Sequence, residues 1–206
     1  MFDDIRDCLW IGCSDYPGAG EGAISPSPKT IFHDNIANLV AASDINCLSA
    51  TQFAIEVYGV SSIVVCGHHA CRGVTTAIED RRFDFLSHWL RTVVRLADKY
   101  KFLIERIAEA SDRLDALCEL NVIDQVAAAC STTVVQKTWA SGQNLSVHGL
   151  IYDRRTVLLA DFRVCISGND ELSTEHAAAI AAFVRRWGHS ALDMLRHRRC
   201  ASAIHL

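Results

Sequence analysis

The chain has 206 residues, of which 50% are hydrophobic and 21% charged. This length and composition suit one compact α/β domain with a substantial core. The net charge of −4 argues against a protein built to bind nucleic acid or an anionic membrane surface.

The expected compartment follows from apolar runs and cysteine usage. No run approaches the roughly 18 apolar residues of a membrane-spanning helix, and the acidic start, MFDDIRDC, lacks the apolar core of a signal peptide. We therefore expect a cytoplasmic protein. An odd number of cysteines, nine, argues against a disulfide framework in such a protein. Most of them should be buried as small apolar residues, and a few could bind metal.

The first third of the chain predicts two buried strands separated by loop and helix. In chain order we expect a strand at 8–13, a Gly- and Pro-rich loop at 18–30, a segment at 31–40 that begins as a strand and becomes helical, and a helix at 47–59. The clearest element follows. Ile63, Val64 and Val65 read as a fully buried parallel strand that Gly67 ends.

The rest of the chain alternates helices with strands. We expect a helix at 71–80, one or two amphipathic helices at 85–110, a helix at 112–130, a pair of strands at 144–153 and 156–164, and a helix at 173–200 broken near Gly188. This order predicts an α/β fold with a central, mostly parallel sheet flanked by helices. We expect one domain over residues 1–206, with a core at 7–165 and a C-terminal helical segment at 172–206.

Two of the predicted strands end in residues that bind metals. Cys13 and Asp15 follow the first strand, and His68 and Cys71 follow the strand at 63–66. The carboxyl ends of parallel strands meet at one edge of a sheet, so these side chains should converge. Thiolates, an imidazole and a carboxylate suit tetrahedral Zn²⁺. Alternatively the cysteines and the histidine are core residues, but the two halves together favour the metal site.

Several motifs resemble one known family, the β-class carbonic anhydrases. They include IGCSD, HDNIANLV, DINCLSATQFAIEVYGVSSIVVCGHHACRGV and LCELNVIDQV, and the resemblance covers about residues 8–162. It implies one zinc ion per subunit, a homodimer often doubled to a tetramer, and CO₂ and bicarbonate as substrates. Carried over by position, Cys13, His68 and Cys71 are the zinc ligands. His69 stands at a variable position and is interpreted as a bystander.

The segment after the first ligand departs from the family pattern. In Cys-x-Asp-Ser-Arg the family's Arg pairs with the Asp and holds it off the metal, but here Tyr16 and Pro17 follow Asp15. An unpaired carboxylate beside Zn²⁺ is drawn to it. We therefore expect Asp15 to be the fourth zinc ligand and, when it leaves the metal, the catalytic proton acceptor. Asp34 also stands where the family commonly has an Arg.

Arg72 follows the ligand Cys71, where the family usually has Gly. It could reach Asp15 or Asp34 and replace the missing partner, because a guanidinium pairs well with a carboxylate. The alternative is a surface residue on the first turn of a helix. We expect the substrate to lie near Tyr16, Arg72 and Gly73.

Three functions remain open on these residues. The first is reversible hydration of CO₂, weak or gated by pH because Asp15 caps the zinc. The second is a catalytically silent, zinc-stabilised scaffold, which the missing arginines favour. The third is hydrolysis of a related small molecule such as COS or CS₂. The sequence favours an enzyme, a carbonic anhydrase.

Overall fold

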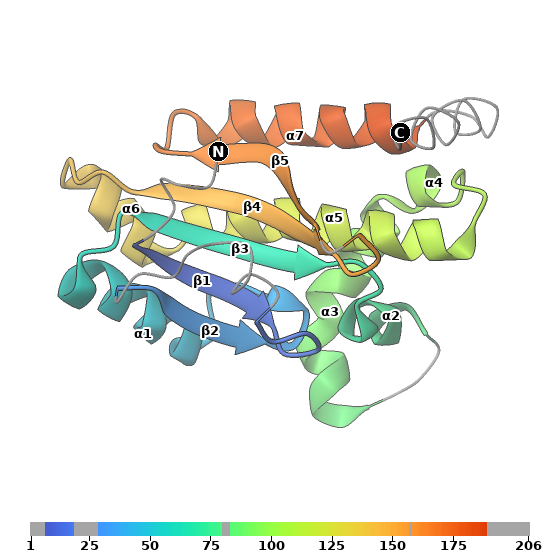
Figure 1. Cartoon of the computed structure of the whole chain (residues 1–206), viewed down its shortest axis with the longest axis horizontal. Helices are drawn as coiled ribbons and strands as arrows, with labels where there is room; N and C mark the ends of the chain where they lie inside the picture. The colour runs from blue at the N-terminus through green and yellow to red at the C-terminus, as the bar shows by residue number, and fades with distance from the viewer. Residues whose placement is uncertain (1–6, 19–28, 80–82, 157, 189–206) are drawn as a thin grey trace, which may run out of the picture.

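A computed structural model of the chain describes residues 7–18, 29–79, 83–156 and 158–188. It contains a five-stranded sheet in the order β2-β1-β3-β4-β5 (Figure 1). The first four strands are parallel, and the last is antiparallel to its neighbour. Their bounds are β1 Cys8–Cys13, β2 Ile31–Asn35, β3 Ser62–His68, β4 Ser146–Asp153 and β5 Leu158–Ile166. The predicted α/β fold with a mostly parallel sheet is confirmed.

The helices occur in the predicted order along the chain, with one further helix at 133–140 that was not predicted. They are η1 Ile36–Asn38, α1 Ile45–Phe53, the π-helical η2 Ala54–Tyr58, α2 Arg72–Ile78, α3 Asp84–Lys99, α4 Lys101–Ile104, α5 Ala110–Cys130, α6 Thr133–Ala140 and α7 Leu172–Trp187. Most of the predicted loop at 18–30 and the last part of the helix predicted at 173–200 lie outside the described residues. The division into a core and a C-terminal segment stays a prediction.

The central strands contribute buried residues to both faces of the sheet. β1 and β3 are buried at every position, whereas β2 alternates between half-buried and exposed residues, as suits an edge strand. Alternate residues of β1 enter different clusters. Leu9, Ile11 and Cys13 pack in the main core, while Cys8 and Trp10 pack in a smaller cluster. Cys13 therefore points toward the main core at the carboxyl edge of the sheet.

Gly67 does not end its strand, which continues to His68. A Cβ atom on Gly67 would lie 2.6 Å from Cγ2 of Val122 in α5. The glycine therefore serves the close packing of a helix on the sheet rather than a turn. This approach fixes α5 beside the strand that carries His68.

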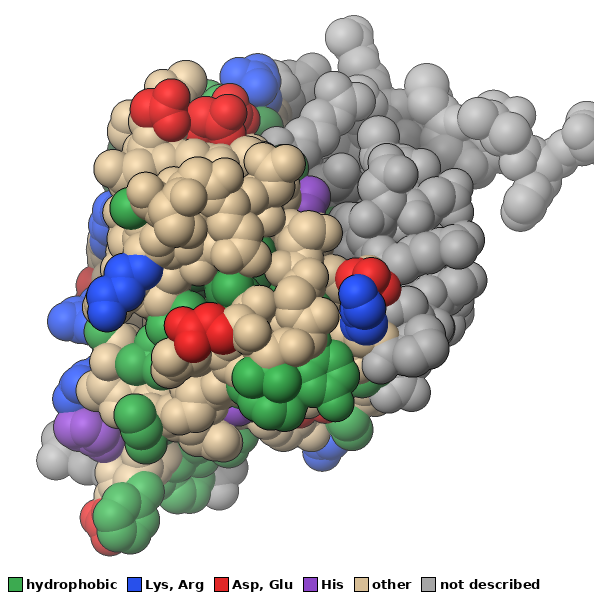
Figure 2. All heavy atoms as spheres, turned by 90° about the vertical axis from the view of Figure 1, so that its left-hand side faces the viewer, with side chains coloured by type: hydrophobic (Ala, Val, Ile, Leu, Met, Phe, Trp, Pro, Cys, Tyr) green, Lys and Arg blue, Asp and Glu red, His purple; other side chains and the backbone are tan. Residues whose placement is uncertain are grey.

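The face at the amino ends of the parallel strands carries charges of both signs. Figure 2 shows acidic and basic side chains there, between separate groups of hydrophobic ones. Among the residues the structure describes, no helix combines the length and apolar character needed to cross a bilayer.

Candidate metal centre

Three metal-binding side chains meet at the carboxyl edge of the sheet. Cys13 ends β1, His68 ends β3, and Cys71 is the N-cap residue of α2. Their ligand atoms all lie within 4.8 Å of one another, and all three residues are buried. The two Sγ atoms are 3.6 Å apart. The predicted convergence of these side chains is confirmed.

The histidine of this cluster is oriented to accept a cation. Nδ1 of His68 lies 3.0 Å from the carbonyl oxygen of His69, and we assign the ring proton to Nδ1 because only a donor fits that contact. Nε2 then carries a lone pair, and among the described residues it is buried without a hydrogen-bond partner. An unpartnered imidazole nitrogen beside two thiols fits the N and S ligands of Zn²⁺.

The two thiols favour a thiolate even before a metal binds. The hydrogen bond from Cys71 lowers the pKa of Cys13 to about 4, although burial opposes the shift. The same contact raises the pKa of Cys71. The backbone N–H of Ala37 also donates to Sγ of Cys13 at 3.3 Å. The pair therefore loses its first proton easily and holds the second, which a metal ion would displace.

Arg72 takes the place of the arginine that the family pattern puts beside Asp15. Its Nε donates to Oδ1 of Asp15 at 2.7 Å, and its backbone N–H donates to Oδ2 at 2.9 Å. Burial by itself raises the pKa of the Asp15 carboxyl, but the two hydrogen bonds from Arg72 outweigh it and lower the pKa below its usual value. Of the two interpretations of Arg72, the partner of Asp15 is therefore the one that the structure shows.

Asp15 lies between this arginine and the metal cluster. Its Oδ2 is 3.7 Å from Nε2 of His68, the nitrogen that faces the thiols. The side chain of Arg72 is 82% exposed, whereas that of Asp15 is 11% exposed. The carboxylate is thus within reach of a bound metal but engaged elsewhere. Its role as fourth zinc ligand and as catalytic residue stays a prediction.

Tyr16 forms one wall of the site. Its ring stacks on Tyr152 at 5.3 Å and lies 5.8 Å from the ring of His68, measured between centroids. The guanidinium of Arg154 lies 4.7 Å from the centre of the Tyr16 ring. The ring of Tyr16 therefore lies beside His68, and the expected position of the substrate near Tyr16 stays a prediction.

Gly73 lies in α2, two residues after Cys71, and Asp34 lies in β2, which pairs with the strand that carries Cys13. A Cβ atom on Gly73 would lie 2.9 Å from Cγ2 of Ile36, so the glycine lets α2 pack closely on η1. The carboxylate of Asp34 lies against Gly12, where a Cβ atom would also approach the indole nitrogen of Trp10. Arg72 contacts Asp15, the first of the two carboxylates that were expected as its partner.

Two buried carboxylates that were not predicted from the sequence, Asp115 and Glu119 of α5, contact the turn between His68 and Cys71. Oδ1 of Asp115 accepts the backbone N–H of Ala70 at 2.9 Å, and Ala70 has a positive φ of 54°. Glu119 lies 3.0 Å from Nε2 of His69 and accepts from Nε1 of Trp187 at 2.7 Å. His69 is therefore a buried, hydrogen-bonded residue, and its interpretation as a bystander in the metal site stays a prediction.

Arginines from other elements balance these buried charges. Arg155 lies 3.3 Å from Oδ2 of Asp115, and Arg186 lies 3.2 Å from Oε1 of Glu119. The spacing of Asp115 and Glu119 places both carboxylates on one face of α5, but it does not identify their partners.

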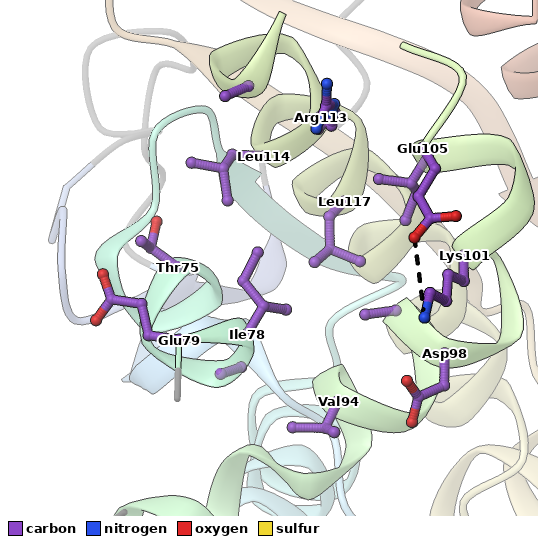
Figure 3. A pocket seen from close by; sticks show the side chains of 14 residues that line it. Thr75, Ile78, Glu79, Val94, Asp98, Lys101, Glu105, Arg113, Leu114 and Leu117 are labelled. Atoms are coloured by element: carbon purple, nitrogen blue, oxygen red, sulfur yellow. Dashed lines mark ion pairs between the residues drawn. The ribbon is translucent and has the colours of Figure 1, made fainter. Parts of the chain in front are cut away.

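A separate groove of about 640 Å³ lies between α2, α3, α4 and α5. Its wall is mostly apolar, and the ion pair between Lys101 and Glu105 stands at its rim (Figure 3). Among the described residues, its lining contains no histidine or cysteine. The groove is thus distinct from the Cys13–His68–Cys71 cluster.

Comparison with known proteins agrees with this geometry. The family model described as carbonic anhydrase matches residues 8–159. A carbonic anhydrase of Emericella nidulans is 31% identical over 161 residues, which are 78% of this chain and 71% of that protein. A carbonic anhydrase of Candida albicans is 36% identical over 162 residues, which are 76% of this chain but only 56% of that protein.

Solved structures show the same fold. A Coccomyxa β-carbonic anhydrase in complex with acetazolamide superposes with a TM-score of 0.73 at 28% identity, covering 82% of this chain and 77% of that one. One of two tetrameric β-carbonic anhydrases from Sordaria macrospora also gives 0.73, at 27% identity over 79% of this chain and 83% of that one. The chain belongs to the carbonic anhydrase family, in its β class.

Proposed function

We propose that the chain catalyses the zinc-dependent, reversible hydration of CO₂ to bicarbonate, with Cys13, His68 and Cys71 as the ligands of one zinc ion per subunit. The observation that carries the proposal is the unpartnered Nε2 of His68 facing two thiols while Arg72 holds Asp15. Zinc bound there would supply a water nucleophile whose pKa is lowered to about 7.

Asp15 is the proton acceptor in this proposal. Its lowered pKa keeps the carboxylate ionised at neutral pH, and its Oδ2 faces the cluster, 3.7 Å from Nε2 of His68. While Asp15 is paired with Arg72, that carboxylate is off the metal and the fourth position is open, as catalysis requires. Tyr16 and Tyr152 then limit what can approach, which suits a small linear substrate.

We expect the activity to be weak and to rise with pH. An ion pair with an exposed arginine contributes only about 0–1 kcal/mol, so zinc competes effectively with Arg72 for Asp15. Two anionic thiolates also make zinc a weaker Lewis acid than neutral imidazoles would. Both effects favour the reaction above neutral pH.

A stopped-flow assay of CO₂ hydration between pH 7 and 9 tests the proposal. Zinc-loaded protein should accelerate hydration, and Cys71→Ser should abolish both zinc binding at the Cys13–His68–Cys71 centre and activity. Cys165→Ser is the matched control, because Cys165 is exposed and outside the cluster. Hydration at the uncatalysed rate throughout, with the Cys13–His68–Cys71 centre occupied by zinc, would contradict the proposal.

That negative result would favour one of two other functions, and a different observation supports each of them. Asp34, an acid where the family commonly has an arginine, favours a silent zinc-stabilised scaffold. The stacked Tyr16 and Tyr152 favour a changed substrate such as COS or CS₂. Release of hydrogen sulfide from COS or CS₂ by the same zinc-loaded protein separates the two.

We also propose that the chain forms a homodimer or tetramer. Phe32, Ile36, Phe83 and Phe85 expose between 38% and 92% of their surface, and a partner subunit would cover such apolar side chains. The Sordaria macrospora relative is tetrameric. Light scattering coupled to gel filtration measures the state directly, and a monomer at micromolar concentration would contradict this.

A further inference from the structure

A second group of metal-binding side chains lies outside the centre already described. His33 of β2, Asp44 at the N-cap of α1 and Cys47 in the first turn of that helix each offer one ligand atom. These three atoms lie within 4.8 Å of one another. We propose that His33, Asp44 and Cys47 bind a second divalent cation of the zinc type, separate from the Cys13–His68–Cys71 centre.

The spacing of the donor atoms fits a single ion after small side-chain rotations. Two ligands of a tetrahedral zinc ion lie roughly 3.3–3.8 Å apart, because the bonds are about 2.0–2.3 Å long. A group whose atoms already lie within 4.8 Å needs to close by about 1.5 Å at most. The donor set of one N, one O and one S excludes ions such as Mg²⁺ and Ca²⁺, which prefer oxygen ligands.

His33 supplies the observation that points to a ligand. Its Nε2 is buried and has no hydrogen-bond partner within the described part of the chain. A buried nitrogen of this kind is unfavourable unless something accepts its lone pair or its proton. The same signature, an unpartnered Nε2, occurs in His68 of the first centre. A cation between His33 and its two neighbours would satisfy it.

Asp44 is fixed in position while it keeps an oxygen for the ion. Its Oδ1 accepts the backbone N–H groups of Asn46 at 3.1 Å and Cys47 at 3.3 Å. Both cap bonds end on Oδ1, so Oδ2 is the oxygen that a cation would take. The cap orients the carboxylate without any metal present, which reduces the cost of assembling the site.

The three ligands differ in solvent exposure. Cys47 is fully buried, whereas His33 and Asp44 are half-buried. An ion can therefore reach the site from the side of the histidine and the carboxylate, and its fourth position would face solvent there. Because one ligand comes from edge strand β2 and two from α1, the ion would link that strand to that helix.

The test counts metal ions in the full-length chain. Protein stripped with a chelator is loaded with Co²⁺ or Zn²⁺, passed through gel filtration and measured by elemental mass spectrometry. We expect two equivalents per chain in the wild type and one in Asp44→Asn. This substitution preserves the helix cap, because asparagine caps as well as aspartate, so a lost equivalent reports a lost ligand and not a lost helix.

Further variants separate the two sites. His33→Gln and Cys47→Ser should each retain one equivalent, and Cys71→Ser should retain the other. His88→Gln is the control, because His88 is an exposed histidine of α3 outside both groups, and it should retain both equivalents. One equivalent in the wild type, or two in Asp44→Asn, would overturn the proposal. These metal counts do not depend on hydration activity.

Discussion

Carboxylates hold the metal-binding turn of residues 68–72 from two sides, and the two sides differ in burial. On the outer side, Asp15 accepts two hydrogen bonds from Arg72, whose side chain is 82% exposed. On the inner side, Glu119 is 1% exposed and contacts His69 and Trp187. Each side joins an acid to a residue next to a proposed metal ligand.

This difference assigns different tasks to the two sides. An exposed ion pair contributes about 0–1 kcal/mol, whereas breaking a buried one costs about 3–5 kcal/mol. The inner side therefore fixes the backbone that carries His68 and Cys71. The outer side can release its carboxylate at little cost. Substitutions inside should change stability and metal affinity, and substitutions outside should change activity.

The largest effect should come from Glu119→Ala. It leaves the hydrogen-bonding nitrogens of His69 and Trp187 without an acceptor and Arg186 without a partner. We expect the free energy of unfolding to fall by about 3 kcal/mol, measured by urea denaturation. Glu109→Ala is the control, because Glu109 is exposed at the start of α5. Equal losses in both variants would remove the distinction between the two sides.

Asp115→Ala should act next most strongly, through the metal. Ala70 holds a positive φ of 54° with its N–H bonded to Asp115, and a non-glycine residue adopts that conformation only when its surroundings impose it. We expect zinc affinity to fall roughly 10- to 100-fold, as is typical when a residue that orients the ligands is lost. Competition with a chromophoric chelator measures this. An unchanged affinity would show that the turn is held by other contacts.

Arg72→Ala should leave the fold intact and reduce catalysis. Without the guanidinium, Asp15 keeps only the backbone N–H of residue 72 and becomes available to the metal. We expect kcat for CO₂ hydration to fall about 10-fold, equivalent to about 1.4 kcal/mol, with a change in unfolding free energy below about 1 kcal/mol. Arg91→Ala, an exposed arginine of α3, is the control. A large loss of stability with normal kcat would reverse the roles of the two sides.

The sequence predicted the parts of this molecule that depend on local pattern. The apolar runs at 8–13 and 63–65 became buried strands, and parallel strands place their carboxyl ends together, so the meeting of Cys13 with His68 and Cys71 followed. Gly67 was misread as a strand end, because the reason for that glycine is the approach of Val122, 55 positions later.

What the sequence missed depends on long-range packing. His69 has its partner Glu119 fifty residues away, and Trp187 completes that contact from α7. No spacing rule connects these positions, since they meet only when α5 and α7 pack together. The pairing of Arg72 with Asp15 was one of two interpretations, because a residue at the start of α2 can equally point into solvent. The backbone at the start of α2 decides between them, because it directs the N–H of Arg72 toward Asp15.

The smallest expected effect is the pH dependence of the outer pair. Burial alone would raise the pKa of Asp15, but the hydrogen bonds from Arg72 lower it below the model-peptide value of 3.8. A lowered folded-state pKa means that the ionised carboxylate stabilises the native state above pH 3.8, and that this contribution is lost as pH falls through the folded-state value.

Metal-free wild type and Arg72→Ala should therefore differ slightly in unfolding free energy between about pH 5 and 7. Their curves should converge as the solution is acidified, because a protonated Asp15 gains little from the guanidinium. The residual backbone hydrogen bond keeps part of the shift in both proteins, and solvent around the exposed arginine weakens the rest. A difference that grows on acidification would mean that Arg72 stabilises the fold through contacts other than Asp15.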